Sequence, residues 1–198
     1  TVGVAPMVKL LPLKIMEAKQ SSTSAATDAI DFAKNKGIRI ANCSWGEINY
    51  NDALKHHMEG ANILFICAAG NKGLDVSQTP FYPACYDLPN VISVAAVNSK
   101  GDLWPCSNYG SMIHVAAPGA CIWTTVPSED QCSYGADSGT SLATPHVTGI
   151  AALILSKYPE LDAADIKDRI IRSVKPLESL KGKVSSGGMV NAYGALTL

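Results

Sequence analysis

The stretch SGTSLATPHVTG, residues 138–149, places Ser141 in a tight Gly-Thr-Ser turn. The apolar run GIAALILSKY follows directly and predicts a long helix from about Ser141 to Lys157. Serine is preferred at helix N-termini and is also a common nucleophile, so its position alone has two explanations. The question is therefore whether Ser141 is a nucleophile, and which base would take its proton.

The composition excludes several classes of protein. The 198 residues are 47% hydrophobic, which is enough for a sizeable core. Sixteen basic and seventeen acidic residues give a net charge of −1 without a long block of either sign, which argues against a nucleic-acid partner. The longest strongly apolar run, GIAALIL, is far shorter than the roughly 20 residues that span a bilayer, so no membrane partner is expected. The first residues, TVGVAPMVKL, lack the pattern of a signal peptide.

Five short apolar runs predict the strands of a sheet. They are VKLLPLKIM (8–16), IRIANCSW (38–45), ILFICAAG (63–70), VISVAAV (91–97) and IHVAAPG (113–119). Most are nearly continuous rather than alternating, which is typical of strands buried on both faces. Because helical segments separate the first three runs, we expect an α/β fold with a mostly parallel β-sheet flanked by helices.

Start and stop signals predict further helices. These helices fall within residues 21–37, 51–60, 162–174 and 187–196. The first ends on Gly37, and the second begins at Asn51 or Asp52, which are residue types preferred at those helix ends. No internal repeat or low-complexity linker divides the chain, so residues 1–198 are interpreted as a single domain.

Polar residues follow three of the predicted strands. Carboxyl ends of strands form the ligand-binding edge of an open α/β sheet, so Ser44–Gly46 and Gly70–Asn71 are expected side by side. A helix starting at Ser141 closes this edge from the other side. The Ser141 backbone N–H and the Asn71 side-chain amide are then candidate donors to a developing oxyanion.

Several motifs in a fixed order carry a family resemblance. They are AAGN (68–71), YPA (82–84), SNYG (107–110), AAPG (116–119) and GTSLATPHVTG (139–149). In this order they resemble the subtilisin-like serine proteases, the subtilases, and the chain is similar to roughly the C-terminal two-thirds of their catalytic domain. The resemblance implies a serine endopeptidase that acts through an acyl-enzyme on Ser141, with Asn71 in the oxyanion hole.

The resemblance also implies a set of substrate-binding residues. They are Ser44, Trp45, Gly46, Ala68, Ala69, Gly70 and Phe81. The first six are expected to pair with an extended polypeptide substrate and to flank its side-chain pocket. Phe81 falls where the family often has a small residue at the pocket floor, so we expect a shallow pocket for small or medium side chains. The Tyr82–Pro83 bond is expected to be cis.

The chain departs from the family in two of the three catalytic residues, the Asp and the His that act with the serine. Subtilases carry their triad in the order Asp, His, Ser, and this chain has no V-x-D-x-G or H-G-T-H-V-A-G segment. None of its four histidines, His56, His57, His114 and His146, matches the catalytic one. We therefore expect the chain to be inactive alone and to need the missing N-terminal segment of the same domain. The alternative is a non-catalytic module that binds extended peptides by strand addition.

The same departure affects the expected sheet. In the family, the strand that ends at the catalytic aspartate lies inside the sheet, beside the strand that residues 8–16 resemble. Without it, ladder groups and apolar faces of both neighbours are uncovered. We expect the chain alone to aggregate, to close the gap with its remaining strands, or to exchange strands between copies.

Six cysteines in a family that is usually secreted predict at least one disulfide and an extracellular or secretory location. Cys121 and Cys132 bracket a predicted β-ribbon and are the preferred pair. Whether Cys85 and Cys106 also pair is left open by the sequence. Cys43 and Cys67 lie in apolar predicted strands and are expected to be buried free thiols that behave as small hydrophobic side chains.

The resemblance leaves two further partners to consider. An inhibitory propeptide is usual in the family. Calcium is common in it as well, and a weaker calcium site near Ala84 and Tyr86 is the one this chain could keep. No Cys-x2-Cys spacing argues for another metal site.

Overall fold

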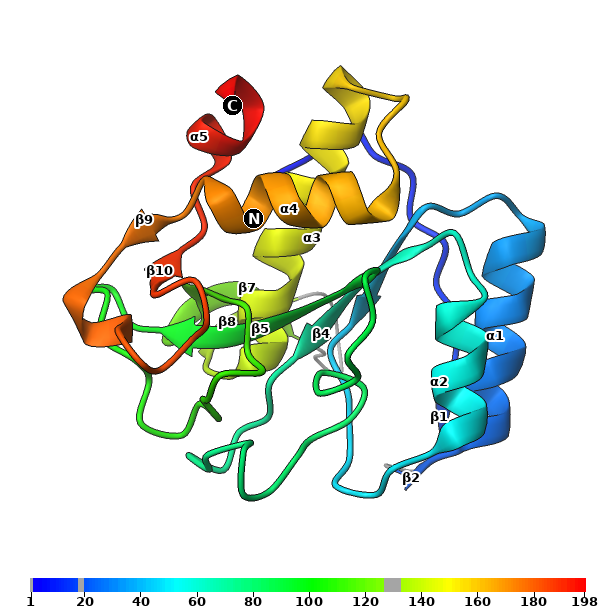
Figure 1. Ribbon diagram of the computed structural model, residues 1–198, viewed down its shortest axis with the longest axis horizontal. Helices are drawn as coiled ribbons and strands as arrows, with labels where there is room; N and C mark the ends of the chain where they lie inside the picture. Colours follow the sequence, from blue (N-terminus) through cyan, green and yellow to red (C-terminus); the bar gives the residue numbers. More distant parts are fainter. Residues whose placement is uncertain (1, 18–19, 127–132) are drawn as a thin grey trace.

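The computed structural model describes residues 2–17, 20–126 and 133–198 (Figure 1). Its main sheet has six strands in the order β3-β4-β5-β6-β10-β9. These are β3 (Ile40–Cys43), β4 (Leu64–Ala68), β5 (Val91–Val97), β6 (Val115–Pro118), β10 (Gly188–Met189) and β9 (Lys175–Pro176). All neighbouring pairs are parallel except β10 with β9. The predicted α/β fold with a mostly parallel sheet is confirmed.

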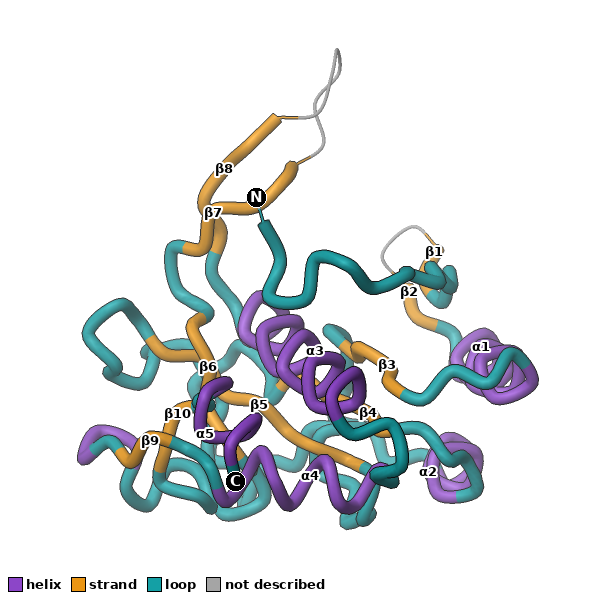
Figure 2. The backbone as a smooth tube through the Cα atoms, turned by 90° about the horizontal axis from the view of Figure 1, so that it is seen from above, coloured by secondary structure: helices purple, strands orange, loops and turns teal. Residues whose placement is uncertain are grey.

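Helices cover both faces of this sheet (Figure 2). One face packs on α3 (Thr140–Lys157), α4 (Ala163–Arg172) and α5 (Ala192–Thr197), and the other on α1 (Thr23–Asn35) and α2 (Asp52–Glu59). Within β4, Leu64 and Ile66 belong to the first interface, whereas Phe65 and Cys67 belong to the second. Because side chains alternate between two buried faces, the strand is apolar at every position.

The helices lie where the sequence predicts them, and their ends have local causes. The Asn51 side chain accepts a hydrogen bond from the Leu54 N–H (2.9 Å) and starts α2. Asp162 and Asp165 cap α4 reciprocally, each side chain accepting from the other's backbone N–H. No helix in the described ranges is long and apolar enough to cross a membrane.

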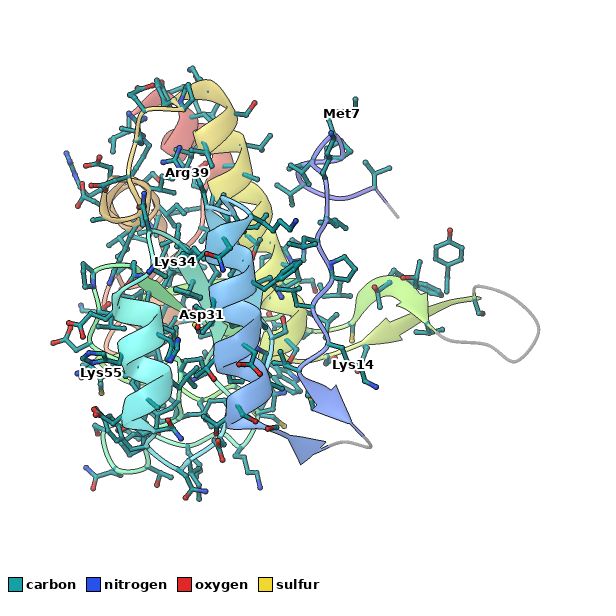
Figure 3. All side chains as sticks on the ribbon, turned by 90° about the vertical axis from the view of Figure 1, so that its right-hand side faces the viewer. Met7, Lys14, Asp31, Lys34, Arg39 and Lys55 are labelled. Carbon is teal, nitrogen blue, oxygen red and sulfur yellow. The ribbon has the colours of Figure 1, made fainter. Side chains whose placement is uncertain are left out.

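The predicted strand over residues 8–16 is wrong. This part of the chain runs beside α3 and α1 outside the main sheet (Figure 3). Only β1 (Met16–Glu17) pairs, and its partner is β2 (Gln20–Ser21) in a separate two-stranded sheet. Of the sixteen exposed large hydrophobic side chains in the described residues, eight lie within residues 2–16. An apolar run forms a strand only where another strand offers its backbone groups, and no strand meets this one.

The ribbon predicted between the last two cysteines exists with different limits. It consists of β7 (Ile122–Val126) and β8 (Ser133–Asp137) and projects from the body of the molecule (Figure 2). The described part of its second strand lies beyond residue 132, so the ribbon extends past the predicted limit. The predicted Cys121–Cys132 disulfide lies outside the described residues because Cys132 does.

The other predictions about thiols concern four of the described cysteines. Cys43 and Cys67 are buried free thiols, as predicted. Cys85 and Cys106 are also free, so the pairing that the sequence leaves open is not formed. Cys85 is buried and accepts a hydrogen bond from the Phe81 N–H on its sulfur, whereas Cys106 is exposed.

Candidate active site

Ser141, in the first turn of α3, lies at the end of β3. Its Oγ donates a hydrogen bond to the Ser44 carbonyl oxygen (3.1 Å), and the Ser44 Oγ donates to the Ser141 carbonyl oxygen (2.9 Å). This reciprocal pair joins two segments that are 97 residues apart in the sequence. The predicted edge, with Ser44 on one side and the start of the helix on the other, is therefore present.

Asn71 lies at the same helix start and takes the place of its cap. The N-cap residue Gly139 has no side chain, and the Asn71 Oδ1 instead accepts from the Thr140 N–H (2.9 Å) and the Thr140 hydroxyl (2.8 Å). The Thr140 Oγ1 in turn accepts from the Gly70 N–H (3.1 Å). Because Oδ1 is held on the helix, the other end of the amide, Nδ2, is free to donate elsewhere.

Two donor groups lie close together beside Gly139. A Cβ built on this residue would lie 3.3 Å from the Asn71 Nδ2 and 3.6 Å from the Ser141 backbone nitrogen. Within the described residues the Ser141 N–H donates to no acceptor, as is usual in the first turn of a helix. The helix dipole adds partial positive charge at this point. This pair of donors is thus suited to an oxygen atom that carries negative charge.

The Asn108 side chain fixes the loop that carries Asn71 by hydrogen bonds. The sequence patterns did not predict this positioning role for Asn108. Its side chain is buried; its Nδ2 donates to the Ala69 carbonyl oxygen (2.9 Å), and its Oδ1 accepts from the Lys72 and Leu74 N–H groups (3.1 and 3.0 Å). Gly70 has a φ of +102°, and a Cβ there would lie 2.4 Å from the Asn108 Nδ2. The only indication of this role in the sequence is that Asn108 belongs to the SNYG motif.

The Phe81 ring fills the space between the ends of two strands. A Cβ built on Gly46 would lie 2.5 Å from the Phe81 Cε1, and one on Gly70 would lie 3.2 Å from Cδ1. Glu47 and Tyr82 exchange backbone hydrogen bonds (2.8 and 2.7 Å), which fix the segment after Phe81 against the segment after Gly46. The predicted cis bond between Tyr82 and Pro83 is confirmed.

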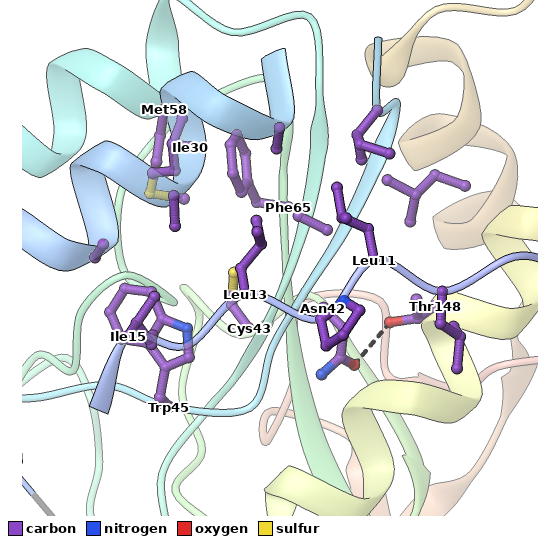
Figure 4. A pocket seen from close by; sticks show the side chains of 18 of the residues that line it. Leu11, Leu13, Ile15, Ile30, Asn42, Cys43, Trp45, Met58, Phe65 and Thr148 are labelled. Carbon is purple, nitrogen blue, oxygen red and sulfur yellow. Dashed lines mark hydrogen bonds between the residues drawn. The ribbon is translucent and has the colours of Figure 1, made fainter. Parts of the chain in front are cut away.

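Trp45 differs from the other predicted substrate-binding residues. Its side chain lines an apolar cavity of about 560 Å³ between residues 9–15, β3 and α1 (Figure 4). Leu13, Cys43 and Phe65 line the same cavity. Ala68, Ala69 and Gly70 are buried behind the edge. The structure therefore brings Ser44, Gly46, Asn71, Phe81 and Ser141 together, and directs the Trp45 side chain away into the cavity.

A comparison with known protein families decides which family this chain belongs to. A model of the Subtilase family matches residues 1–195. The chain belongs to the subtilase family. Ser141 and Asn71 fall in the motifs on which the resemblance was based.

Individual relatives of this subtilase agree in sequence and in structure. The chain is 40% identical to Subtilisin DY from Bacillus licheniformis over 85% of the chain and 61% of that relative, and 33% identical to Subtilisin-like protease 2 from Plasmodium falciparum over 98% and 15%. A solved protease from Pseudoalteromonas arctica superposes with a TM-score of 0.86 at 28% identity, covering 98% of this chain and 64% of that one. A lanthipeptide protease superposes with a TM-score of 0.85 at 26% identity, covering 98% and 71%. The chain thus spans 61% and 15% of the length of these two curated relatives.

The histidines of this subtilase are engaged elsewhere. The ring nitrogens of His57, His114 and His146 contact the Asp31 Oδ1 (3.0 Å), the Ser93 Oγ (2.6 Å) and the Leu142 carbonyl oxygen (2.9 Å), and His56 is exposed on α2. Burial, with a smaller effect of the Lys167 charge, lowers the pKa of His114 to about 4. No histidine contacts Ser141 in the described structure. The Ser141 hydroxyl instead donates to the backbone carbonyl oxygen of Ser44.

Near the implied calcium site of this subtilase, the described residues offer no cluster of carboxylate side chains to a calcium ion. Ala84 and Tyr86 are buried, and burial raises the pKa of Tyr86 to about 12, so its hydroxyl remains neutral. The Lys167 Nζ donates to the Leu88 carbonyl oxygen (3.0 Å) and brings a positive charge to this loop. The described residues hold no group of three or more His, Cys, Asp or Glu side chains suited to a metal ion.

Proposed function

We propose that this chain is part of a serine endopeptidase in which Ser141 forms an acyl-enzyme with a polypeptide substrate. One observation carries the proposal: the Asn71 Nδ2 and the Ser141 backbone nitrogen lie close together beside Gly139, at the helix start that carries the Ser141 hydroxyl. Donors placed around a developing oxyanion stabilise the transition state of acyl transfer.

The reaction then follows from these positions. The Ser141 Oγ attacks the carbonyl carbon of the peptide bond while a base removes its proton, and the carbonyl oxygen becomes an oxyanion held by Asn71 and the Ser141 N–H. The amine leaves with a proton from the protonated base, and water then hydrolyses the Ser141 ester. The Ser141 hydroxyl must first release the Ser44 carbonyl oxygen that it contacts at rest.

Substrate selection is proposed for the edge around Ser141. Backbone groups of Ser44–Gly46 would pair with an extended polypeptide, and Ala68–Gly70, whose Ala69 carbonyl and Gly70 N–H are bonded within the molecule, would flank its side-chain pocket. Between them, the Phe81 ring takes up the room for a side chain, because it lies against both Gly46 and Gly70. We therefore propose a preference for small or medium side chains on the acyl side of the scissile bond.

A further segment is proposed to supply the catalytic Asp and His. One region of the described structure is uncovered. It consists of the open side of β3, the apolar cavity beside β3, and the exposed hydrophobic side chains of residues 2–16. A parallel strand needs a partner and apolar cover on both faces, and this region offers both. The relatives are longer than the matched region, which leaves room for such a segment. We propose that it enters between residues 9–15 and β3, so that residues 1–198 form one part of a single catalytic domain.

The family membership also supports two proposals that concern the cell. They are an inhibitory propeptide as a partner and an extracellular or secretory location. Both rest on the resemblance to subtilisins.

The experiment is covalent labelling of Ser141 with a fluorophosphonate, read by intact mass and peptide mapping. The chain is labelled alone and after mixing with the upstream segment that carries Asp and His, and a Ser141→Ala chain is the matched control. We expect an adduct on Ser141 only in the mixture, because an unactivated serine reacts poorly.

Other outcomes separate the alternatives. Equal labelling of the chain alone, in a preparation free of the segment, would contradict the need for a supplied base. Binding of an extended peptide without an adduct in either sample would favour the non-catalytic peptide-binding module over the endopeptidase.

A further inference from the structure

An asparagine interrupts the apolar pattern of β3. Asn42 lies on the side of the strand that faces α3, two residues after the apolar Ile40. Asparagine is depleted in strands, so a polar side chain at this place needs partners. It has two, because its Oδ1 accepts from the Thr148 hydroxyl on α3 (2.9 Å) and its Nδ2 donates to the Ser44 Oγ (2.9 Å). Figure 4 shows the first of these bonds at the wall of the apolar cavity.

The second bond leads to the nucleophile. The Asn42 Nδ2 can only donate, so the single proton of the Ser44 hydroxyl remains for the Ser141 carbonyl oxygen, to which it donates (2.9 Å). In a regular helix this carbonyl would accept from the N–H four residues later, but that residue is Pro145, which has no N–H. The Ser44 hydroxyl therefore takes the place of the missing helical donor at Ser141.

We propose that Asn42 is a positioning residue for the nucleophile, acting through the Ser44 hydroxyl on the Ser141 carbonyl. The proposed function, on which this inference rests, makes Ser141 the nucleophile. Asn42 directs the Ser44 proton to Ser141 and so fixes the first turn of α3 against the end of β3. Because the attacking hydroxyl belongs to the same residue, its position depends on this bond. Small displacements of a reacting group from its productive geometry are costly in rate.

The same side chain links the nucleophile to the cavity. Asn42 and Thr148 are polar members of a mostly apolar lining, and Asn42 is exposed in the described structure. The proposed Asp- and His-bearing segment would cover them and exclude water, which strengthens hydrogen bonds. Both polar atoms of the amide already have a partner, so its burial leaves neither of them unpaired. Entry of the segment therefore fixes Ser141 more firmly as well as supplying its base.

The first experiment measures the rate of fluorophosphonate labelling at Ser141 while the concentration of the upstream segment is raised. At saturating segment, Asn42→Ala should lower this rate by about tenfold, the size expected for the loss of one hydrogen bond, with little change in the half-saturating concentration. Ser44→Ala keeps the backbone carbonyl and should have a similar effect. The double variant should be no slower than Ser44→Ala, because Asn42 acts through that hydroxyl. Asn62→Ala, at an exposed asparagine, is the matched control and should label like the unchanged chain.

Two results of this experiment would overturn the inference. If the effects of Asn42→Ala and Ser44→Ala multiplied in the double variant, Asn42 would not act through Ser44. If Asn42→Ala raised only the half-saturating concentration and left the saturated rate unchanged, Asn42 would be a wall residue of the cavity without a role in positioning Ser141.

The second experiment does not depend on activity. Amide hydrogen exchange of residues 139–144 is followed by mass spectrometry in the chain alone. We expect exchange to be about tenfold faster in Asn42→Ala and in Ser44→Ala than in the unchanged chain and in Asn62→Ala, because the first turn of α3 opens more often. Equal exchange in all four chains would overturn the inference. Absence of a Ser141 adduct in the mixture with the unchanged chain would instead contradict the proposed function, and the exchange result would still decide whether Asn42 fixes the start of α3.

Discussion

The centre of the sheet and its β3 side are built from similar residues but are closed to different degrees. β5 lies between β4 and β6, and all seven of its residues are buried. β3 has a neighbour on one side only, and one of its four residues is buried. Residues 8–16 are also rich in apolar side chains, although Lys9, Pro12 and Lys14 interrupt them, and they remain outside the sheet. The difference teaches that burial depends on the backbone partners a segment finds, not on its apolar content alone.

The comparison predicts opposite effects of two similar truncations. Ile92→Ala, at a fully buried position of β5, should lower the free energy of unfolding by about 2–5 kcal/mol because it leaves a cavity. Leu10→Ala, at a side chain that is 86% exposed, should change it by less than about 0.5 kcal/mol. Urea unfolding followed by circular dichroism measures both. A large loss for Leu10→Ala would contradict the comparison, because the segment would then be packed.

The edge around Ser141 should tolerate little change even though the cavity side is open. Asn71→Ala in the assembled enzyme should lower kcat by about 10²–10³-fold with a smaller effect on KM, a range known for an oxyanion-hole donor in a subtilisin. Because Asn71 also caps Thr140, the variant should lose about 1 kcal/mol of stability. Steady-state kinetics measure the effect, with the exposed Asn62→Ala as control. An unchanged kcat would remove Asn71 from the mechanism.

The centre of the sheet should also be sensitive to acid. His114 has a folded-state pKa of about 4, against about 6.5 when unfolded, so between these values the unfolded chain binds a proton that the folded chain does not. The free energy of unfolding should therefore fall as the pH drops from 6.5 to 4, by about 3 kcal/mol in total. Unfolding curves across this range measure the slope.

A matched pair of variants isolates the histidine responsible. His114→Gln should remove this part of the pH dependence, whereas His56→Gln, at an exposed position, should retain it. The same slope in both variants would show that other groups cause the acid sensitivity.

The smallest effect is expected at the side-chain pocket. Phe81→Ala should raise kcat/KM for substrates with a large aromatic side chain on the acyl side by about 10–200-fold relative to small ones, because the ring between Gly46 and Gly70 is removed. A peptide panel assayed on the assembled enzyme measures the ratio. An unchanged ratio would mean that the Phe81 ring does not form the pocket floor.

Sequence patterns were most successful where the cause of a structure is local. Asn51 and Asp162 start their helices because each side chain reaches a backbone N–H three residues away. Four strands were predicted because each has a continuous apolar run. Residues 8–16 have such a run as well, but whether it pairs depends on a strand elsewhere, so the pattern could not exclude the error. The limits of the ribbon were missed because its register is set by pairing of Ile122 with Asp137.

The candidate site shows the same division. Ser141 and Asn71 were predicted from motifs, whereas no role was predicted for Thr140 and Asn108, although Thr140 bonds the Asn71 side chain and Asn108 bonds the loop that carries it. Their partners are up to 70 residues away in the sequence, so no local pattern reports them.

The sequence by itself determined the family, the nucleophile turn, the helix ends and the apolar runs, because all of these are written in neighbouring residues. Only the tertiary structure decided that the Asn71 amide caps the helix of Ser141 and that the Phe81 ring lies between two glycines. It also decided that Cys43, and not Cys85, lines the apolar cavity beside β3. These features depend on which distant groups meet in space, and hydrogen bonding and packing between them are settled only when the chain is folded.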